Sequence, residues 1–137
     1  MTDLPAPGDS PGFDRALGLT LTAADGDEVR ATITVTPAQH QPYGIVHGGV
    51  YCAVVESTAS IGGALWFAGR GQVVGVSNTT SFIRAVREGT LDVVATPLHR
   101  GRTAQLWQVF ITDDRERLIA KGEVRLANIA DAEQLGQ

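Results

Sequence analysis

The chain of 137 residues has a single cysteine, Cys52, so no intrachain disulfide can form. It also has no excess of positive charge, because 11 lysines and arginines against 15 aspartates and glutamates give a formal net charge of −4. That balance gives no electrostatic reason to bind nucleic acid or an anionic membrane surface. We therefore expect no nucleic acid and no membrane among its partners.

Targeting signals and long apolar runs are lacking as well. The first residues, MTDLPAPGDSPGF, have neither a basic start nor an apolar core, and they do not resemble a signal peptide. The longest apolar stretch, residues 50–68, is interrupted by Glu56, hydroxyl residues and glycines, which favours a buried helix over a membrane span. With 43% hydrophobic and 19% charged residues, the composition is that of a globular protein, which we expect in the cytoplasm.

The sequence lacks the residue patterns of zinc sites, nucleotide-binding loops and serine nucleophile turns. His40, His47 and His99 lack the spacing of zinc ligands, and Cys52 has no partner. No glycine loop of the nucleotide-binding type occurs. The Gly-x-Ser-x-Gly pattern at residues 8–12 lies in proline-rich chain, without the strand and helix that a nucleophile turn needs. We therefore expect no metal site.

What the sequence does contain is a strand pattern along most of its length. Apolar and polar residues alternate over residues 17–24 and 29–36, and Asp25-Gly26 between them is a hairpin signal. Gly75 marks a possible bulge or point of close approach in a later strand. Four further strands are predicted at residues 72–86, 89–99, 103–112 and 117–129.

One segment is too long and too apolar for a strand. Residues 47–67 are apolar on most faces, which predicts a helix buried on nearly all sides. Antiparallel strands joined by short turns, with one helix to fill their core, predict an α+β hotdog fold, in which the sheet wraps around the central helix. Residues 13–129 would form this single domain, between a loose N-terminal arm (1–12) and a C-terminal tail (130–137). Such a sheet leaves edges to cover, so we expect a homodimer.

Glu56 is the one carboxylate between residues 45 and 69. An ionised carboxylate in an apolar setting is costly unless it is paired, hydrated or protonated. Gly48 and Gly49, at the predicted helix start, would present free backbone N–H groups that can polarise a carbonyl. Eight helical residues separate Gly48 from Glu56 by about 12 Å, so one carbonyl cannot touch both. Two antiparallel helices across a two-fold axis could supply one group each, which is compatible with an active site shared between subunits.

The residues alone leave plain structural explanations open. Gly48 and Gly49 could merely satisfy the backbone geometry of the helix start. Glu56 could be neutralised by an arginine, for example Arg84 or Arg102, and have no catalytic part.

The sequence also leaves open the roles of two polar residues near Glu56 and the helix start. Ser60 follows Glu56 by four residues on the same helical face, where it could place a water or simply pack closely. Gln41, in the loop before the helix, could bind a substrate or merely face solvent.

The stretch QPYGIVHGGVYCAVVESTAS, residues 41–60, resembles the helix-start signature of hotdog-fold acyl-CoA thioesterases that use a glutamate on the central helix. Within that group it looks most like the bacterial 4-hydroxybenzoyl-CoA and 1,4-dihydroxy-2-naphthoyl-CoA thioesterases. The likeness covers roughly residues 15–128 and includes FIRAVREG, TPLHRGRTAQLWQVFITDD and LIAKGEVRLA. It implies hydrolysis of an acyl-CoA, with an aryl-CoA expected, to the free acid and CoA. CoA is then part of the substrate, no separate cofactor is needed, and a homodimer or a tetramer built from two dimers is expected.

The resemblance also implies roles, position by position. Glu56 matches the catalytic carboxylate, which acts as nucleophile or as the base for water. Gly48 matches the residue whose backbone N–H polarises the thioester carbonyl. His47 and Gln41 match positions near that carbonyl or the departing thiol, and Ser60 matches the residue that helps place the hydrolytic water.

Binding positions follow in the same way. Arg84, Arg87 and Arg102 fall in segments that lie near the CoA nucleotide in such enzymes, and arginine suits phosphate chemically. Gly49 is expected to line the substrate site beside the carbonyl. Close relatives often carry a histidine where this chain has Phe82, so a more apolar contact with the acyl group or CoA is expected there.

Two other functions stay open from the sequence. One is a hotdog hydratase or dehydratase acting on acyl-CoA or acyl carrier protein, which would rely on a histidine in a different motif. The other is a non-catalytic protein that binds acyl-CoA. The joint presence of Gln41, Gly48, Glu56 and Ser60 argues against the second.

Overall fold

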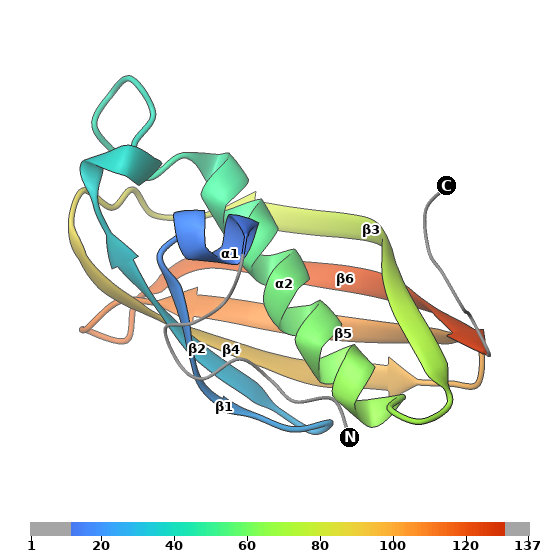
Figure 1. The fold of residues 1–137 in the computed structure, drawn as a ribbon. Helices are drawn as coiled ribbons and strands as arrows, with labels where there is room; N and C mark the ends of the chain where they lie inside the picture. Colours follow the sequence, from blue (N-terminus) through green and yellow to red (C-terminus); the bar gives the residue numbers. More distant parts are fainter. Residues whose placement is uncertain (1–11, 131–137) are drawn as a thin grey trace.

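The computed structural model describes residues 12–130, which form one six-stranded antiparallel sheet and one long helix (Figure 1). Apart from Gly12 and Ala130, the predicted arm and tail lie outside the described residues. The elements are α1 (Phe13–Ala16), β1 (Leu19–Ala24), β2 (Val29–Val35), the short 3-10 helix η1 (Pro37–Gln39), α2 (Gly48–Trp66), β3 (Gly71–Phe82), β4 (Gly89–Arg100), β5 (Ala104–Thr112) and β6 (Leu118–Ala130).

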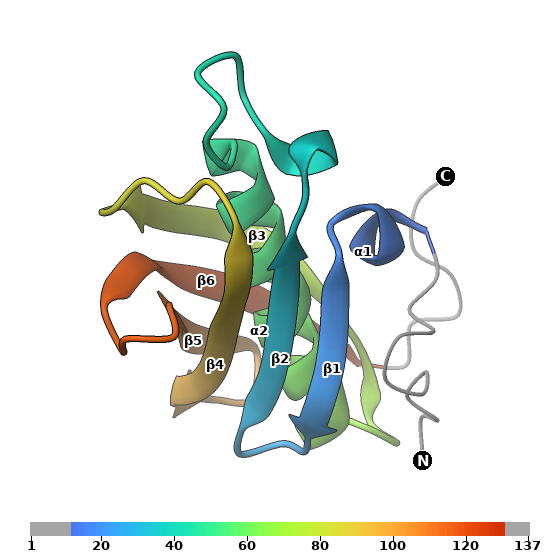
Figure 2. The same cartoon turned by 90° about the vertical axis from the view of Figure 1, so that its left-hand side faces the viewer.

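The strands lie side by side in the order β1-β2-β4-β5-β6-β3, and every neighbouring pair is antiparallel (Figure 2). The long helix separates β2 from β3 in the chain, and β3 joins the far side of the sheet by pairing with β6. Strands β1 and β3 are therefore the two edge strands. The register of β3 shifts between Gly75 and Ser77, which confirms the irregularity predicted at Gly75.

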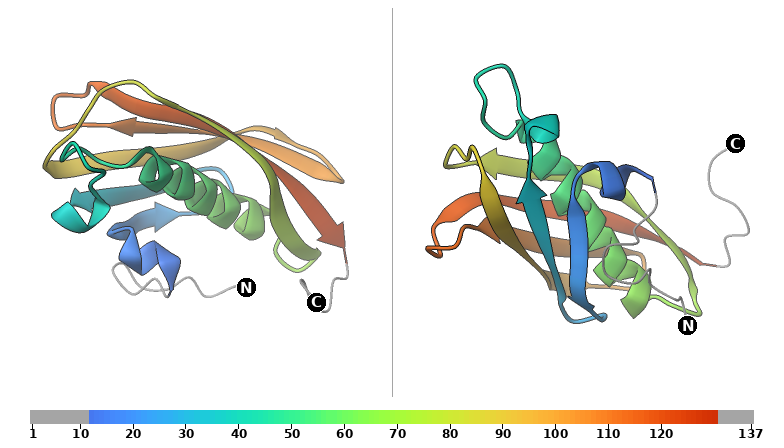
Figure 3. Two further views of the ribbon diagram at one scale, coloured as in Figure 1. Left: turned by 90° about the horizontal axis from the view of Figure 1, so that it is seen from above. Right: turned by 60° about the vertical axis from the view of Figure 1, so that its left-hand side comes forward.

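The sheet curves over α2, as the view from above shows (Figure 3). Alternate residues of the strands face the helix, because successive side chains of a strand point to opposite sides. Val54, Val55 and Ala59 of α2 are fully buried in this core. Their partners on the two central strands are Leu91, Val93 and Ala95 of β4 and Trp107, Val109 and Ile111 of β5.

The predicted α+β hotdog arrangement is confirmed, and the helix predicted over residues 47–67 is observed as α2, Gly48–Trp66. The strand predicted over residues 72–86 ends earlier, at Phe82, where its pairing with β6 ends at Ala120. The prediction that the helix is buried on nearly all sides is wrong for the single chain. One face of α2 looks away from the sheet, and Glu56 on this face is exposed. No helix within residues 12–130 is long and apolar enough to cross a membrane.

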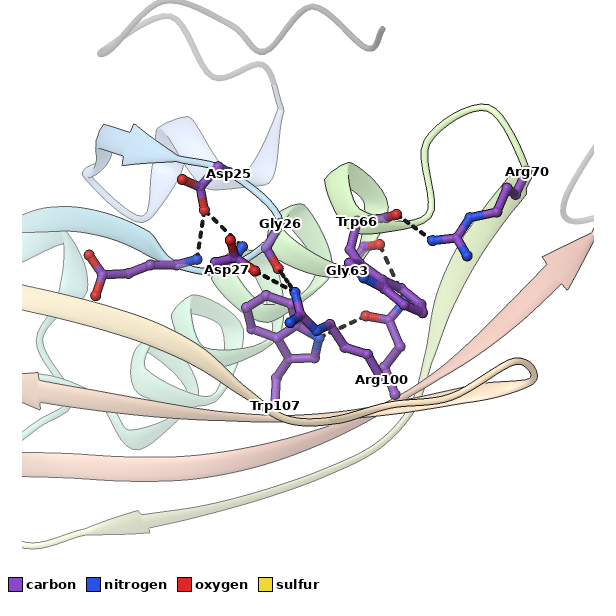
Figure 4. Close-up of polar contacts among 10 residues, drawn as sticks. Asp25, Gly26, Asp27, Gly63, Trp66, Arg70, Arg100 and Trp107 are labelled. Carbon is purple, nitrogen blue, oxygen red and sulfur yellow. Dashed lines mark hydrogen bonds and ion pairs between the residues drawn. The ribbon is translucent and has the colours of Figure 1, made fainter.

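The C-terminal end of α2 is fastened to the β1–β2 hairpin (Figure 4). The Arg100 guanidinium donates to the carbonyl of Gly26 at 2.6 Å and to the carboxylate of Asp27 at 2.7 Å. It also lies 5.6 Å from the ring centre of Trp66, and Arg70 lies 4.2 Å from the same ring. These contacts hold the C-terminal end of α2 against the β1–β2 hairpin.

Candidate active site

The N-terminus of α2 presents a free backbone donor. His47 is the N-cap residue, and its Nδ1 accepts a hydrogen bond of 2.8 Å from the backbone N–H of Gly49. The N–H of Gly48, one residue earlier, makes no hydrogen bond within residues 12–130. This donor lies at the positive end of the helix dipole, where it can stabilise negative charge on an oxygen.

Phe82 lies directly against this helix start. A Cβ atom at Gly48 would come within 2.4 Å of the Phe82 ring, so a larger residue would require that half-exposed ring to move. The Phe82 ring lies 6.1 Å from that of Tyr51, centre to centre. The Tyr51 hydroxyl is buried and has no hydrogen-bond partner in the part of the chain described, and burial raises the pKa of Tyr51 to about 12. The aromatic pair therefore makes a largely apolar wall beside the free N–H.

Four of the predicted site residues line one cavity of about 220 Å³ at this point: Gln41, Gly48, Phe82 and Arg84. The Gln41 side-chain oxygen accepts a hydrogen bond from the backbone N–H of Tyr43, which ties it to its own loop. The structure therefore brings these four residues together within a single chain.

Glu56 lies in a different cavity, of about 460 Å³, on the face of α2 that looks away from the sheet. No ion pair to Glu56 is found among the described residues, so the structure does not support its neutralisation by Arg84 or Arg102 within one chain. A Cβ atom at Gly75 would lie 3.5 Å from the Glu56 carboxyl carbon, so β3 passes close to the carboxylate. The lining residues are Asp14, Glu56, Ser57, Ser60, Ile61, Ala64, Leu65 and Val73.

Ser60 joins Glu56 in this cavity, as the spacing of four residues predicted. The other walls of the cavity are mainly apolar, because Ile61, Leu65 and Val73 supply them. A carboxylate and a hydroxyl beside apolar walls can bind an apolar group with a polar reacting centre.

Two residues near Glu56 were not predicted. Asp14 of α1 lines the same cavity and accepts a hydrogen bond of 2.5 Å from the Ser57 hydroxyl. Asn78 of β3 donates a hydrogen bond of 2.9 Å to the carbonyl of Cys52, one turn before Glu56. Asn78 thereby fixes β3 against this part of the helix.

His47 and Gly49 face neither of these cavities. They line a third one, of about 400 Å³, together with residues of α1 and η1. The predicted residues therefore lie on three sides of the helix start and along one face of the helix. Within a single chain they do not form one continuous site.

The predicted arginines are also divided. Arg84 and Arg87 line a polar cleft of about 430 Å³ with Arg115 and Arg117, which were not predicted. This cleft adjoins the cavity of about 220 Å³ beside Gly48, which we call the Gly48 cavity, because Arg84 lines both. Arg102 lies in the β4–β5 turn, at the other end of a strand of 12 residues that spans roughly 40 Å. The single chain does not bring Arg102 near the other arginines.

One salt bridge and one contact with a loop hold two of the arginines of this cleft. The Arg117 guanidinium pairs with Asp113 at 2.7 Å, and Arg87 donates to the carbonyl of Tyr43 at 3.1 Å.

Among residues 12–130, no group of three or more histidine, cysteine, aspartate or glutamate side chains could hold a metal ion.

Comparison with known proteins identifies relatives over most of the chain. Residues 43–120 match the family described as the Thioesterase superfamily. A protein of Mycobacterium tuberculosis named "Putative esterase Rv1847" is 48% identical over 120 residues, which are 85% of this chain and 86% of the relative. Its solved structure matches with a TM-score of 0.85 over 88% of this chain and 98% of that one.

Two further relatives have names that state an activity. The 1,4-dihydroxy-2-naphthoyl-CoA hydrolase of Escherichia coli is 36% identical over 101 residues, which are 74% of each chain. The structure of the thioesterase HI1161 of Haemophilus influenzae is 31% identical and has a TM-score of 0.85, covering 93% of this chain and 89% of that one.

Proposed function

This chain belongs to the thioesterase superfamily, and from that membership and the geometry of α2 we propose that it hydrolyses an acyl-CoA thioester, with an aryl-CoA as substrate. The observation that carries the proposal is the pairing of two groups on one helix. Gly48 offers a free N–H at the helix start, and Glu56 offers a carboxylate in a mainly apolar cavity. The products are the free acid and CoA.

In this reaction the N–H of Gly48 donates a hydrogen bond to the thioester oxygen, which gains negative charge as the carbonyl carbon is attacked. Loss of one such donor typically lowers the rate by about 10²–10³. His47 supports the donor indirectly, because its ring accepts the N–H of Gly49 and fixes the first turn. Gln41 lines the same cavity as Gly48, where its amide can contact the carbonyl or the departing thiol.

Glu56 can act in two ways. As a nucleophile, its oxygen bonds to the carbonyl carbon, the carbon–sulfur bond breaks, and the thiolate leaves and takes up a proton; water then cleaves the mixed anhydride. As a base, Glu56 takes a proton from water while the water oxygen bonds to the carbonyl carbon; the carbon–sulfur bond then breaks, and the departing thiolate takes the proton from Glu56. Ser60, one turn away in the same cavity, would hold the water in either scheme.

The distance between the two groups requires a second copy of the chain. Gly48 and Glu56 are about 12 Å apart along the helix, so they cannot act on one carbonyl within a chain. Strand β3 is an edge strand of 12 residues without a charged side chain, and its Val76 is 56% exposed. Long uncharged edges pair readily with another strand. We propose that two copies pair through β3, so that Glu56 of one chain faces Gly48 of the other; a tetramer would join two such dimers.

The CoA part of the substrate would leave the Gly48 cavity past Arg84. Beyond Arg84 lies the polar cleft with Arg87, and guanidinium groups bind phosphate well. Phe82 would contact the arm of the substrate near the carbonyl. Gly49 lines the separate cavity beside α1 and η1, so we assign it no contact with this arm within one chain. Arg102 could contribute only from the second copy, since it lies at the far end of the sheet.

Thiol release tests the proposed reaction. The wild type and Glu56→Ala are assayed with benzoyl-, hydroxybenzoyl-, hydroxynaphthoyl-, phenylacetyl- and medium-chain acyl-CoA. We expect release by the wild type only, with aryl esters turned over fastest. No release by a folded wild type would contradict hydrolysis of these esters, and tight binding without release would favour a binding protein.

Sedimentation tests the shared site. A lysine in place of Val76 on β3 should give monomers and remove activity, although Gly48 and Glu56 are unchanged. Thr22→Lys, at an exposed position on the other edge strand β1, is the matched control and should leave both properties unchanged. An active monomeric Val76→Lys protein would overturn the shared site.

A further inference from the structure

The Glu56 cavity holds a second carboxylate that the proposed reaction does not use. Asp14 comes from α1, which lies beside α2 (Figure 1). Its Oδ1 accepts a hydrogen bond of 2.5 Å from the Ser57 hydroxyl. The segment is anchored just behind Asp14, because Leu17 is buried and its carbonyl accepts a hydrogen bond of 2.6 Å from the Gln39 side chain. Asp14 is therefore a built part of the cavity wall.

A carboxylate here has unused capacity to accept hydrogen bonds. Asp14 is half-buried, and no ion pair to it is found among the described residues. One of its oxygens takes the Ser57 hydroxyl, whereas a carboxylate can accept about four hydrogen bonds. A ligand that displaces water from Asp14 without donating a hydrogen bond leaves this acceptor unsatisfied, which costs binding energy.

The position of Asp14 along the cavity is defined by its partner. Ser57 directly follows Glu56 in the sequence, so Asp14 lies at the level of the reacting carbonyl. The cavity continues along the helix past Ile61 to Leu65, which lies about 12 Å beyond Ser57. The polar end of the cavity is thus near the thioester, and its far end is apolar.

We propose that Asp14 selects the acyl group, by accepting a hydrogen bond from a hydroxyl that the acyl group bears close to its thioester. On an aromatic ring these are the 2- and 3-positions, whereas a 4-hydroxyl points toward the apolar end near Leu65. The ring itself packs against Ile61 and Leu65. This inference rests on the proposed function, since it places the acyl group beside Glu56.

A purely structural role for Asp14 makes a different prediction. If the Asp14–Ser57 hydrogen bond only docks α1, its loss lowers the melting temperature and the rates with all substrates together. The ratio between substrates then stays constant. A role in selection changes that ratio, because only the 2- and 3-hydroxy esters lose a hydrogen-bond partner.

The test compares kcat/KM, measured by thiol release, for benzoyl-CoA and its 2-, 3- and 4-hydroxy derivatives. The wild type should prefer the 2- or the 3-hydroxy ester over benzoyl-CoA by about 10-fold. Asp14→Leu should remove most of this preference and leave the ratio of 4-hydroxybenzoyl- to benzoyl-CoA unchanged, whereas Asp14→Asn, which keeps a neutral amide oxygen as acceptor, should weaken the preference less. Arg15→Gln, a charge change at the next residue of α1, should keep the preference. Ratios that are the same in wild type and both Asp14 variants would overturn the inference.

Measurements of ester binding test the role of Asp14 separately from the proposed hydrolysis. Dissociation constants for the same four esters are measured by calorimetry in Glu56→Gln, with and without Asp14→Leu. Tighter binding of the 2- or 3-hydroxy ester, lost with Asp14→Leu, supports selection by Asp14 even if the wild type releases no thiol. Thiol release by the wild type with equal affinities for all four esters would retain the proposed function and overturn the role of Asp14. Absence of binding by all four esters would overturn it as well.

Discussion

The face of α2 that lies against the sheet and the face that looks away from it differ in how completely their surroundings are filled. On the sheet side, Val54 and Val55 are fully buried, and a Cβ atom at Gly62 would come within 2.5 Å of the Trp107 ring. On the other side, Glu56 lines an open cavity of about 460 Å³. The packed face stabilises the fold, whereas the open face has room for a ligand or a second chain.

Polar groups on the two faces differ in the same way. On the sheet side, the buried Gln105 side chain donates to the Gly63 carbonyl at 3.2 Å and accepts from the Trp107 indole at 2.8 Å (Figure 4). On the open side, no ion pair to Glu56 is found in the part of the chain described. Buried polar groups with satisfied hydrogen bonds help to fix one structure. Polar groups kept without partners for a reaction often lower the stability of the protein. The comparison therefore separates residues that should affect stability from residues that should affect activity.

The largest expected effect is on activity, from Glu56→Gln. This change keeps the shape of the side chain but removes the charge needed for attack or proton transfer, so we expect kcat to fall by at least about 10³. Stability should be nearly unchanged, because Glu56 is exposed and makes no ion pair within residues 12–130. Thiol-release assays and urea denaturation measure the two properties. A large loss of stability with activity retained would reverse the roles assigned to the two faces.

Two glycine-to-alanine changes sharpen the comparison. Gly62→Ala should destabilise the protein by about 1–3 kcal/mol, because the new methyl overlaps the fully buried Trp107. Gly75→Ala places a methyl at an ordinary contact distance, 3.5 Å from the Glu56 carboxyl carbon, so it should alter kcat more than stability. Urea denaturation and kcat of each variant test the pair. Equal stabilities for the two variants would contradict the difference in packing.

The helix and the strands could be predicted because their signals are local. The apolar stretch that begins after His47 defined α2 to within one residue at each end, and alternation located the strands. Gly75 was predicted as a bulge or a close approach; the strand register shifts directly after it, whereas a Cβ atom there would meet Glu56 only at ordinary contact distance. The spacing of Glu56 and Ser60 placed them in one cavity because a helix face is set by sequence distance alone.

Other features depend on contacts between distant segments, which the sequence does not display. Asp14 lies 42 residues before Glu56, in a short helix without a periodic pattern, and nothing local connects it to the cavity. An apolar composition also cannot tell which face of α2 meets the sheet, so the exposure of Glu56 was missed. Arg102 is an arginine like Arg84 and Arg87, but the sequence does not show how far apart they lie. In the structure the whole length of β4 separates Arg102 from the other two.

A loss of stability of similar size to that of Gly62→Ala is expected from Gln105→Leu. The change removes the acceptor of the buried Trp107 indole N–H and the donor to the Gly63 carbonyl, which should cost about 1–3 kcal/mol. Gln108→Leu, on the same strand but on its half-buried outer side, is the matched control and should change stability by less than about 0.5 kcal/mol. Urea denaturation measures both. Similar losses would mean that the hydrogen bonds of Gln105 contribute little.

The smallest effect is expected far from α2, in the β5–β6 turn. Burial raises the pKa of the Asp113 carboxyl, but hydrogen bonds from the backbone and guanidinium of Arg117 and from the backbone of Arg115 lower that pKa more, so the net shift is downward. A folded pKa below the unfolded value of about 3.9 adds stability above that pH, and the contribution is lost as the pH falls through the folded pKa. Asp113→Asn should therefore be slightly less stable than the wild type at pH 7 and pH 5, and the difference should shrink below about pH 4. Asp114→Asn, one residue on, is the matched control, because none of these hydrogen bonds involves its side chain. Urea midpoints at pH 7, 5 and 3 test this, and a difference for Asp113→Asn that persists unchanged at pH 3 would show that the turn is not held by the charge of Asp113.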